Sequence, residues 1–222
     1  MKTFAISLII AVAAASGVRA STPVALGPSD SVENVSMPTW TILWWHWAFS
    51  MDQRLSPIRD RTGERCALNQ SGPVWYLTGG FGVDSVIRYC TVPANRHLFF
   101  PVVNLLIAPS ENEPITCAEA QKKASFDRVD FLNFWVRVND VDMRDAVMLV
   151  SSPDCFDVMA RMPKIYKAPM VFPAATSGFW VMMEPLPEGK HVIQFGAQDT
   201  RGGKPNDGII QAVEYVLTVE AE

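Results

Sequence analysis

GFWVMMEPLPEGKHVIQFGA (residues 178–197) and IIQAVEYVLTV (residues 209–219) are the stretches that decide the fold of this 222-residue chain. The first predicts two strands, over 178–184 and 191–197, separated by a Pro/Gly-bearing turn. The second predicts the closing strand, because its apolar side chains alternate onto one face: Val213, Tyr215, Leu217 and Val219. Short strands punctuated by closely spaced turns are typical of an antiparallel sandwich. We therefore expect an all-β fold, mainly an antiparallel β-sandwich.

The middle of the chain carries the same strand pattern. Residues 74–77 form a short apolar run, and residues 85–92 alternate as a two-faced strand does. Residues 97–104 continue the series, and Pro101 within them predicts an edge strand or a bulge because proline donates no backbone hydrogen bond. Residues 134–143 predict a hairpin that turns at Asn139-Asp140.

Two helices accompany the strands. Residues 38–51, PTWTILWWHWAFSM, predict the first, and Pro38 suits its first turn. This helix is apolar nearly all round, so we expect it to be buried against the sheets. Thr116 and Glu119 form a capping-box pattern that opens a further short helix, reaching about Ser125.

The N-terminus predicts export. A short basic start, an apolar run from Phe4 to Ala15 and the Val18-Arg19-Ala20 sequence predict a signal peptide over residues 1–20. The apolar run is shorter than the ~20 residues that a membrane-spanning helix needs. Polar residues 21–37 predict a flexible N-terminal arm, and residues 38–222 a single domain. We expect a secreted protein, periplasmic or extracellular, with no membrane span.

The net negative charge of the chain argues against nucleic acid and anionic membranes as partners. Without Lys2 and Arg19 of the predicted leader, 17 basic side chains stand against 23 acidic ones. A net negative chain lacks the basic footprint that nucleic acid or an anionic membrane requires. Asn34 and Asn69 begin N-glycosylation sequons, so a eukaryotic source and a glycoprotein stay open.

The four cysteines allow three pairings. Sequential pairing, Cys66 with Cys90 and Cys117 with Cys155, is our prediction, because each bridge then closes a loop of moderate length around one strand-rich segment. Each bridge would contribute roughly 3–4 kcal/mol by loop entropy. The chain has no C-x-x-C pattern and no histidine at zinc-ligand spacing from a cysteine, so neither a metal nor a cofactor is expected.

Three segments together resemble a family of uncharacterised secreted bacterial proteins. These are LWWHWAFS (residues 43–50), DRTGERCALNQSGPVWYLTG (60–79) and RYCTVPANRHLFFPVVN (88–104). The resemblance spans about residues 40–104 and implies export, but no activity. The C-terminal strands also resemble the end of an immunoglobulin-like sandwich.

The candidate site residues gather in these segments, and each allows a structural interpretation. Trp44, Trp45 and Trp47 form either an aromatic platform for a ligand or part of the core, and the lack of a polar face favours the core. His46 is either an acid–base group or a core histidine bonded to a backbone carbonyl, which is the commoner arrangement. Asp60 with nearby arginines either binds a carboxylate or pins a long loop.

Uncharged polar residues inside the apolar motif segments pose the same question. Gln70 and Asn104 are amides that either hold loop backbone or line a pocket.

Our first hypothesis is therefore a protein that binds a small-molecule or glycan ligand at a pocket beside the Trp-rich helix. Its candidate ligand-binding residues are Trp44, Trp45, Arg61, Trp75 and Arg88. The alternatives are a cofactor-free hydrolase, lyase or cyclase that uses His46 and Asp60 as acid–base groups, and a structural or surface-interaction module. The oligomeric state stays open.

Overall fold

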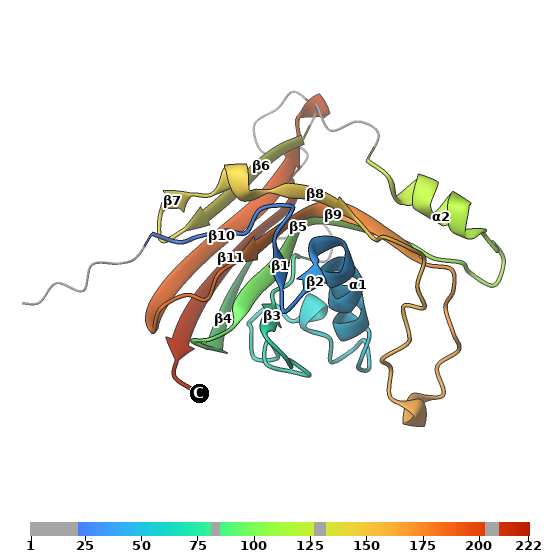
Figure 1. Cartoon of the computed structure of the whole chain (residues 1–222), viewed down its shortest axis with the longest axis horizontal. Coiled ribbons are helices and arrows are strands. Elements are labelled where there is room, and N and C mark those ends of the chain that lie inside the picture. The colour runs from blue at the N-terminus through green and yellow to red at the C-terminus, as the bar shows by residue number, and fades with distance from the viewer. Residues whose placement is uncertain (1–21, 81–84, 127–131, 203–208) are drawn as a thin grey trace, which may run out of the picture.

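The chain forms two β-sheets packed face to face, with one long helix outside them (Figure 1). The computed structural model describes residues 22–80, 85–126, 132–202 and 209–222. The predicted signal peptide lies outside the described residues. The five-stranded sheet has the order β4 (Ser85–Pro93), β11 (Ile209–Glu220), β10 (Gly189–Asp199), β6 (Leu132–Val138) and β7 (Val141–Asp142). The four-stranded sheet has the order β3 (Val74–Tyr76), β5 (His97–Ile107), β9 (Ala175–Met183) and β8 (Met148–Ser151).

The expected β-sandwich is thus present, and most of its pairs are antiparallel. Two pairs, β4 with β11 and β3 with β5, are parallel. The hairpin of β6 and β7 turns at Asn139 and Asp140, whose positive φ angles of 49° and 66° suit the tight turn predicted there.

The alternating side chains of the two sheets fill the core between them. Val136, Ile193, Phe195 and Leu217 of the five-stranded sheet are fully buried there, and the ring of Phe100 of β5 packs on that of Phe195 at a tilt of 31°. Strand β9 is buried along its whole length. Phe179, Val181 and Met183 join the core between the sheets, and Trp180 and Met182 lie in the cluster that α1 (Met37–Ala48) covers. This explains why residues 178–184 are apolar at nearly every position.

Pro101 lies in an interior strand, so the edge-strand alternative is wrong and the bulge is confirmed. Strand β5 pairs with β3 only over His97–Phe99, which leaves Pro101 beyond the last partner on that side. On the other side the register with β9 shifts between Pro101 and Val103. A short neighbour and a bulge together accommodate the missing N–H.

Helix α1 covers the outer face of the four-stranded sheet (Figure 1). Trp40, Trp44 and Trp47 are at most 5% exposed. Each of their indole nitrogens donates to a backbone carbonyl, of Val35, Leu77 and Leu68 respectively. These three tryptophans are core residues, and each buried N–H has a partner.

The second helix and the N-terminal segment are attached at opposite ends of β9. Helix α2 (Cys117–Ala124) has the predicted capping box, and its Ala120 and Ala124 pack on Ala175. The N-terminal segment, in which we expected a flexible arm over residues 21–37, is described from residue 22. Its Leu26 N–H donates to the Met182 carbonyl, and β1 (Ser31–Val32) pairs with β2 (Val35–Ser36) just before α1.

Four short 3-10 helices complete the described chain: η1 (Pro57–Arg59), η2 (Arg144–Ala146), η3 (Lys164–Tyr166) and η4 (Thr200–Gly202). The two disulfides are Cys66–Cys90 and Cys117–Cys155, which confirms the sequential pairing. Among the described residues, no helix has the length and apolar character needed to cross a bilayer.

Candidate functional site

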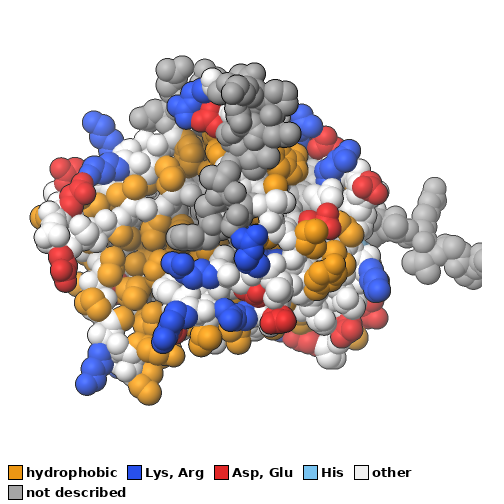
Figure 2. Space-filling view, turned by 180° about the vertical axis from the view of Figure 1, so that it is seen from behind, with side chains coloured by type: hydrophobic (Ala, Val, Ile, Leu, Met, Phe, Trp, Pro, Cys, Tyr) orange, Lys and Arg blue, Asp and Glu red, His pale blue; other side chains and the backbone are white. Residues whose placement is uncertain are grey.

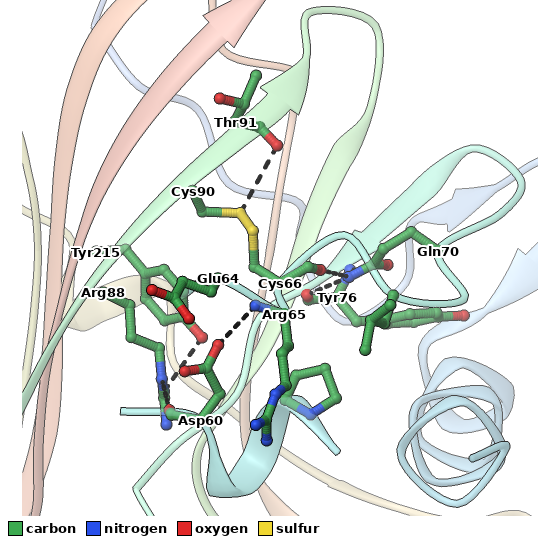
Figure 3. The surroundings of a disulfide bond; sticks show 12 residues. Asp60, Glu64, Arg65, Cys66, Gln70, Tyr76, Arg88, Cys90, Thr91 and Tyr215 are labelled. Carbon is green, nitrogen blue, oxygen red and sulfur yellow. Dashed lines mark hydrogen bonds between the residues drawn. A yellow bond between two sulfur atoms is a disulfide. The ribbon is translucent and has the colours of Figure 1, made fainter. Parts of the chain in front are cut away.

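Three successive residues of β4 fasten the loop that follows η1 (Figure 3). Arg88 Nε donates to the Asp60 carbonyl at 2.6 Å. The Tyr89 N–H donates to the Thr62 carbonyl at 2.9 Å. Cys90 then forms the disulfide with Cys66. The alternation of β4 explains this, since Arg88 and Cys90 point inward while Tyr89 is 65% exposed and contributes backbone only.

Arg88 is a buried cation that binds backbone carbonyls. It is 2% exposed, and besides Asp60 its guanidinium donates to the carbonyls of Thr78 at 2.8 Å and Gly79 at 3.1 Å. It also lies over the ring of Tyr215 and donates to its hydroxyl. One planar group with five donors therefore joins the residue 58–60 segment to the residue 78–79 segment.

The Asp60 carboxylate organises its own loop. Burial raises the pKa of the Asp60 carboxyl, but N–H donors from Arg65, Thr62 and Gly63 and the Thr62 hydroxyl outweigh that effect, so its pKa lies below the ordinary value. Gly63 has a φ of +91°, and a Cβ there would lie 2.3 Å from the Tyr89 carbonyl oxygen. The loop therefore approaches β4 as closely as only glycine allows.

The two segments that Arg88 joins form walls of a pocket beside α1. The pocket has a volume of about 240 Å3. Its apolar wall consists of Trp44, Trp45, Phe49, Ile58 and Pro101, and its remaining lining residues are Gln53, Arg59, Gly79, Gly80, Asn104 and Gln211. A concave, largely aromatic surface with a few polar groups is the usual form of a small-molecule site.

Besides Gln53 and Arg59, two amides from the sheets, Gln211 and Asn104, line the pocket. Gln211 is 6% exposed, accepts from the Gly80 N–H at 2.8 Å and donates to the Val102 carbonyl, so it ties the glycine segment to β5. A Cβ on Gly79 would lie 2.1 Å from the Gln211 side-chain oxygen, so any larger residue there would displace the Gln211 amide. Asn104 differs, because its buried Nδ2 has no hydrogen-bond partner among the described residues.

His46 lies on another side of α1. Its Nε2 donates to the Asp157 carbonyl at 2.9 Å, and its ring meets that of Phe156 edge-on. A carbonyl can only accept, so the proton of the neutral ring resides on Nε2. This is the core arrangement considered from the sequence.

The other predicted site residues are scattered. Trp44 and Trp45 line the pocket, whereas Trp75 points into the core between the sheets. Arg88 is buried behind the pocket walls, and Arg61 is exposed on the loop. Neither His46 nor Asp60 lines the pocket, and among its described lining residues there is no carboxylate or histidine. The described part of the chain also contains no cluster of three metal-ligating side chains.

The structure separates the two amides that the sequence left undecided. Gln70 holds backbone, since its amide binds the carbonyls of Cys66 and Tyr76 and the Tyr76 N–H. Asn104 lines the pocket. Phe49, Ile58 and Gln211 were missed as pocket residues, because they come from three elements that only the tertiary fold brings together.

Burial of His46 predicts a pH-dependent loss of stability. Burial lowers the pKa of the folded His46 below its ordinary value of 6.5, an effect that the Asp157 carbonyl partly offsets. Below about pH 6.5 the unfolded chain therefore binds a proton that the folded chain does not, so stability is lost as the pH falls. We expect His46→Gln, whose amide can still donate to the carbonyl, to lose less stability between pH 7 and pH 5. Urea unfolding of the native chain and the variant gives the free energy of unfolding at each pH in this range. If this free energy fell equally with pH in both proteins, His46 would not be the group responsible.

Comparison with family models and with curated proteins finds no match. Among solved structures, the cysteine protease inhibitor EhICP2 of Entamoeba histolytica is 12% identical, with a TM-score of 0.28 over 65% of this chain and 93% of that one. PbICP-C, solved in complex with falcipain-2, is 10% identical, with a TM-score of 0.27 over 65% and 98% of the two chains. These scores are too low to contribute to a functional argument.

Proposed function

We propose that this chain is an exported binding protein that takes a small, largely apolar ligand in the pocket beside α1. The observation that carries the proposal is Asn104, which lines a pocket wall together with two tryptophans and whose side-chain nitrogen is buried without a partner among the described residues. An unsatisfied buried amide costs roughly 1–3 kcal/mol, so a ligand that accepts its hydrogen bond recovers that cost.

The size and lining of the pocket define the class of ligand. A volume of about 240 Å3 is below the usual ~300–1,000 Å3 of drug-sized sites, so it suits a single ring rather than an oligosaccharide. Trp45 and Phe49 are half-buried and supply aromatic surface, and Asn104 supplies a donor. We therefore propose a monocyclic molecule that carries a carbonyl, carboxylate or hydroxyl oxygen.

We also propose that the chain is exported and that it is related to the family of secreted bacterial proteins that residues 40–104 resemble. The predicted leader and the two disulfides support an oxidising compartment, because disulfides persist outside the reducing cytosol. The acid–base alternative is not favoured, since Asp60 is engaged by loop N–H groups and His46 by the Asp157 carbonyl.

Asn104→Leu tests the proposal against a purely structural role for this amide. We expect the variant to raise the free energy of unfolding by about 1 kcal/mol, because it removes an unpartnered donor. Gln70→Leu is the matched control, and we expect it to lower that free energy by about 2 kcal/mol since it leaves three backbone groups of residues 66 and 76 unpaired.

The same variants are then tested for binding. Melting temperatures are measured with benzamide, phenylacetate, phenol and, for the glycan alternative, glucose and N-acetylglucosamine. A compound at a hundredfold excess over its Kd raises the melting temperature of the native chain by about 5–10 °C. We expect one of the aromatic compounds to do so and Asn104→Leu to abolish the shift. No shift with any aromatic compound, or a shift retained in Asn104→Leu, contradicts the proposal.

A further inference from the structure

The segment between β8 and β9 projects from the body of the protein. We call residues 158–173 the projecting loop; Figure 1 shows it extending away from both sheets with η3 at its tip. Ile165 is 83% exposed and Met170 72%, the highest values among the large hydrophobic side chains of the described chain. Tyr166 and Phe172 are each 50% exposed. Exposed apolar side chains gathered at one place mark an interaction site.

The base of the projecting loop is firmly built. The Asp157 carboxylate accepts from the Met159 N–H at 3.0 Å and the Val171 N–H at 2.9 Å, which closes the loop on itself. Phe156 and Ala174 form a bridge below it. The His46 bond to the Asp157 carbonyl attaches this base to α1. The tip is therefore presented on a fixed stem.

The charge of the projecting loop has one sign. Between Asp157 and Glu184 the sequence has no acidic residue, while Arg161, Lys164 and Lys167 are all exposed. Figure 2 shows hydrophobic and basic side chains together at the lower left, where the loop projects. The chain as a whole is net negative, which disfavours anionic partners for most of its surface. Charges are screened over about 8 Å at physiological salt, so the loop presents its own local charge.

We propose that the projecting loop docks on an anionic lipid surface, with Ile165 and Met170 in the acyl boundary and the basic side chains on the headgroups. The projecting loop offers four exposed large apolar side chains, far fewer than the roughly 20–30 residues that each partner contributes to a stable protein interface. A lipid surface admits such a tip without a preformed groove. Acidic lipid headgroups are complementary in charge to Arg161, Lys164 and Lys167, as in other interfacial membrane anchors. The pocket beside α1 plays no part in this proposal.

Vesicle sedimentation tests it with the processed chain, from Ser21 onward. We expect the chain to bind phosphatidylcholine vesicles that contain phosphatidylglycerol, to bind pure phosphatidylcholine at least tenfold more weakly, and to be released by salt. Ile165→Ser/Met170→Ser should weaken binding about tenfold or more. Lys164→Gln and Lys167→Gln should each weaken it about fivefold.

Ile87→Ser/Val192→Ser is the matched control, because these side chains are 52% and 37% exposed on β4 and β10 of the five-stranded sheet, whereas the projecting loop joins two strands of the four-stranded sheet. It should bind as the native chain does. Equal loss of binding in this control, or native binding that ignores lipid charge, overturns the proposal. A native chain that stays in the supernatant with every vesicle also overturns it, and leaves an acidic protein as the partner of the loop.

Discussion

Replacing Arg88 with leucine is expected to lower the free energy of unfolding by about 3–5 kcal/mol. The buried guanidinium is the hydrogen-bond donor for the carbonyls of Asp60, Thr78 and Gly79. An apolar replacement of a buried ion pair can be neutral when both partners are replaced, but backbone carbonyls remain after the substitution. Each one left without a donor costs roughly 1–3 kcal/mol. Chemical denaturation of the purified variant measures the loss.

Two further variants isolate the reason. Arg88→Lys keeps the charge but lacks the planar group with several donors. We therefore expect it to recover less than half of the stability that Arg88→Leu loses. Arg137→Leu removes an exposed arginine from the outer face of β6, and it should change stability by less than about 0.5 kcal/mol. A loss below about 1 kcal/mol for Arg88→Leu would show that water or a local rearrangement satisfies these carbonyls.

Removing the Cys66–Cys90 disulfide as Cys66→Ala/Cys90→Ala is expected to cost about 3.5 kcal/mol and also to weaken ligand binding. The bridge spans 24 residues of sequence and fixes the loop whose start supplies Ile58 and Arg59 to the pocket. Without it, hydrogen bonds from Arg88 and the Tyr89 N–H hold the loop to β4, so the spacing of the pocket walls is less firmly fixed.

Cys117→Ala/Cys155→Ala provides the comparison. This bridge spans 38 residues, so loop entropy assigns it a similar contribution of about 4 kcal/mol. It attaches α2 rather than the pocket loop, so affinity measured well below the melting temperature should be unchanged. If both double variants changed the affinity equally, the Cys66–Cys90 bridge would have no special role in positioning the pocket wall, which would contradict this prediction.

The sequence predicts the elements well because their patterns are local. The Trp-rich helix, the capping box at Thr116 and the Asn139-Asp140 turn follow from nearest-neighbour chemistry. Of the two alternatives for Pro101, the bulge is confirmed and the edge strand is wrong, because the length of β3, a separate strand, decides which N–H groups of β5 need a partner.

The candidate site was less accessible from the sequence. Arg88 lies in an alternating strand, and nothing local shows that its face, rather than that of Ile87 and Tyr89, is buried. Gln70 and Asn104 have the same chemistry and lie in similar apolar segments, yet one holds backbone and the other is left with an unpaired N–H. Only the packing of β5, β11 and α1 around the pocket distinguishes Asn104 from Gln70.

The central claim is that the space beside α1 is a ligand site, and indole N–H signals in a 15N-labelled sample test it most directly. The chain has seven tryptophans. Trp45 lines the pocket and donates to Thr176, whereas Trp135 lies on the outer face of the other sheet. Titration with the stabilising aromatic compound is predicted to shift the Trp45 signal, saturably and at the Kd of the melting experiment, and to leave Trp135 in place. A shift confined to Trp135, or equal small shifts of all seven signals, would contradict the account.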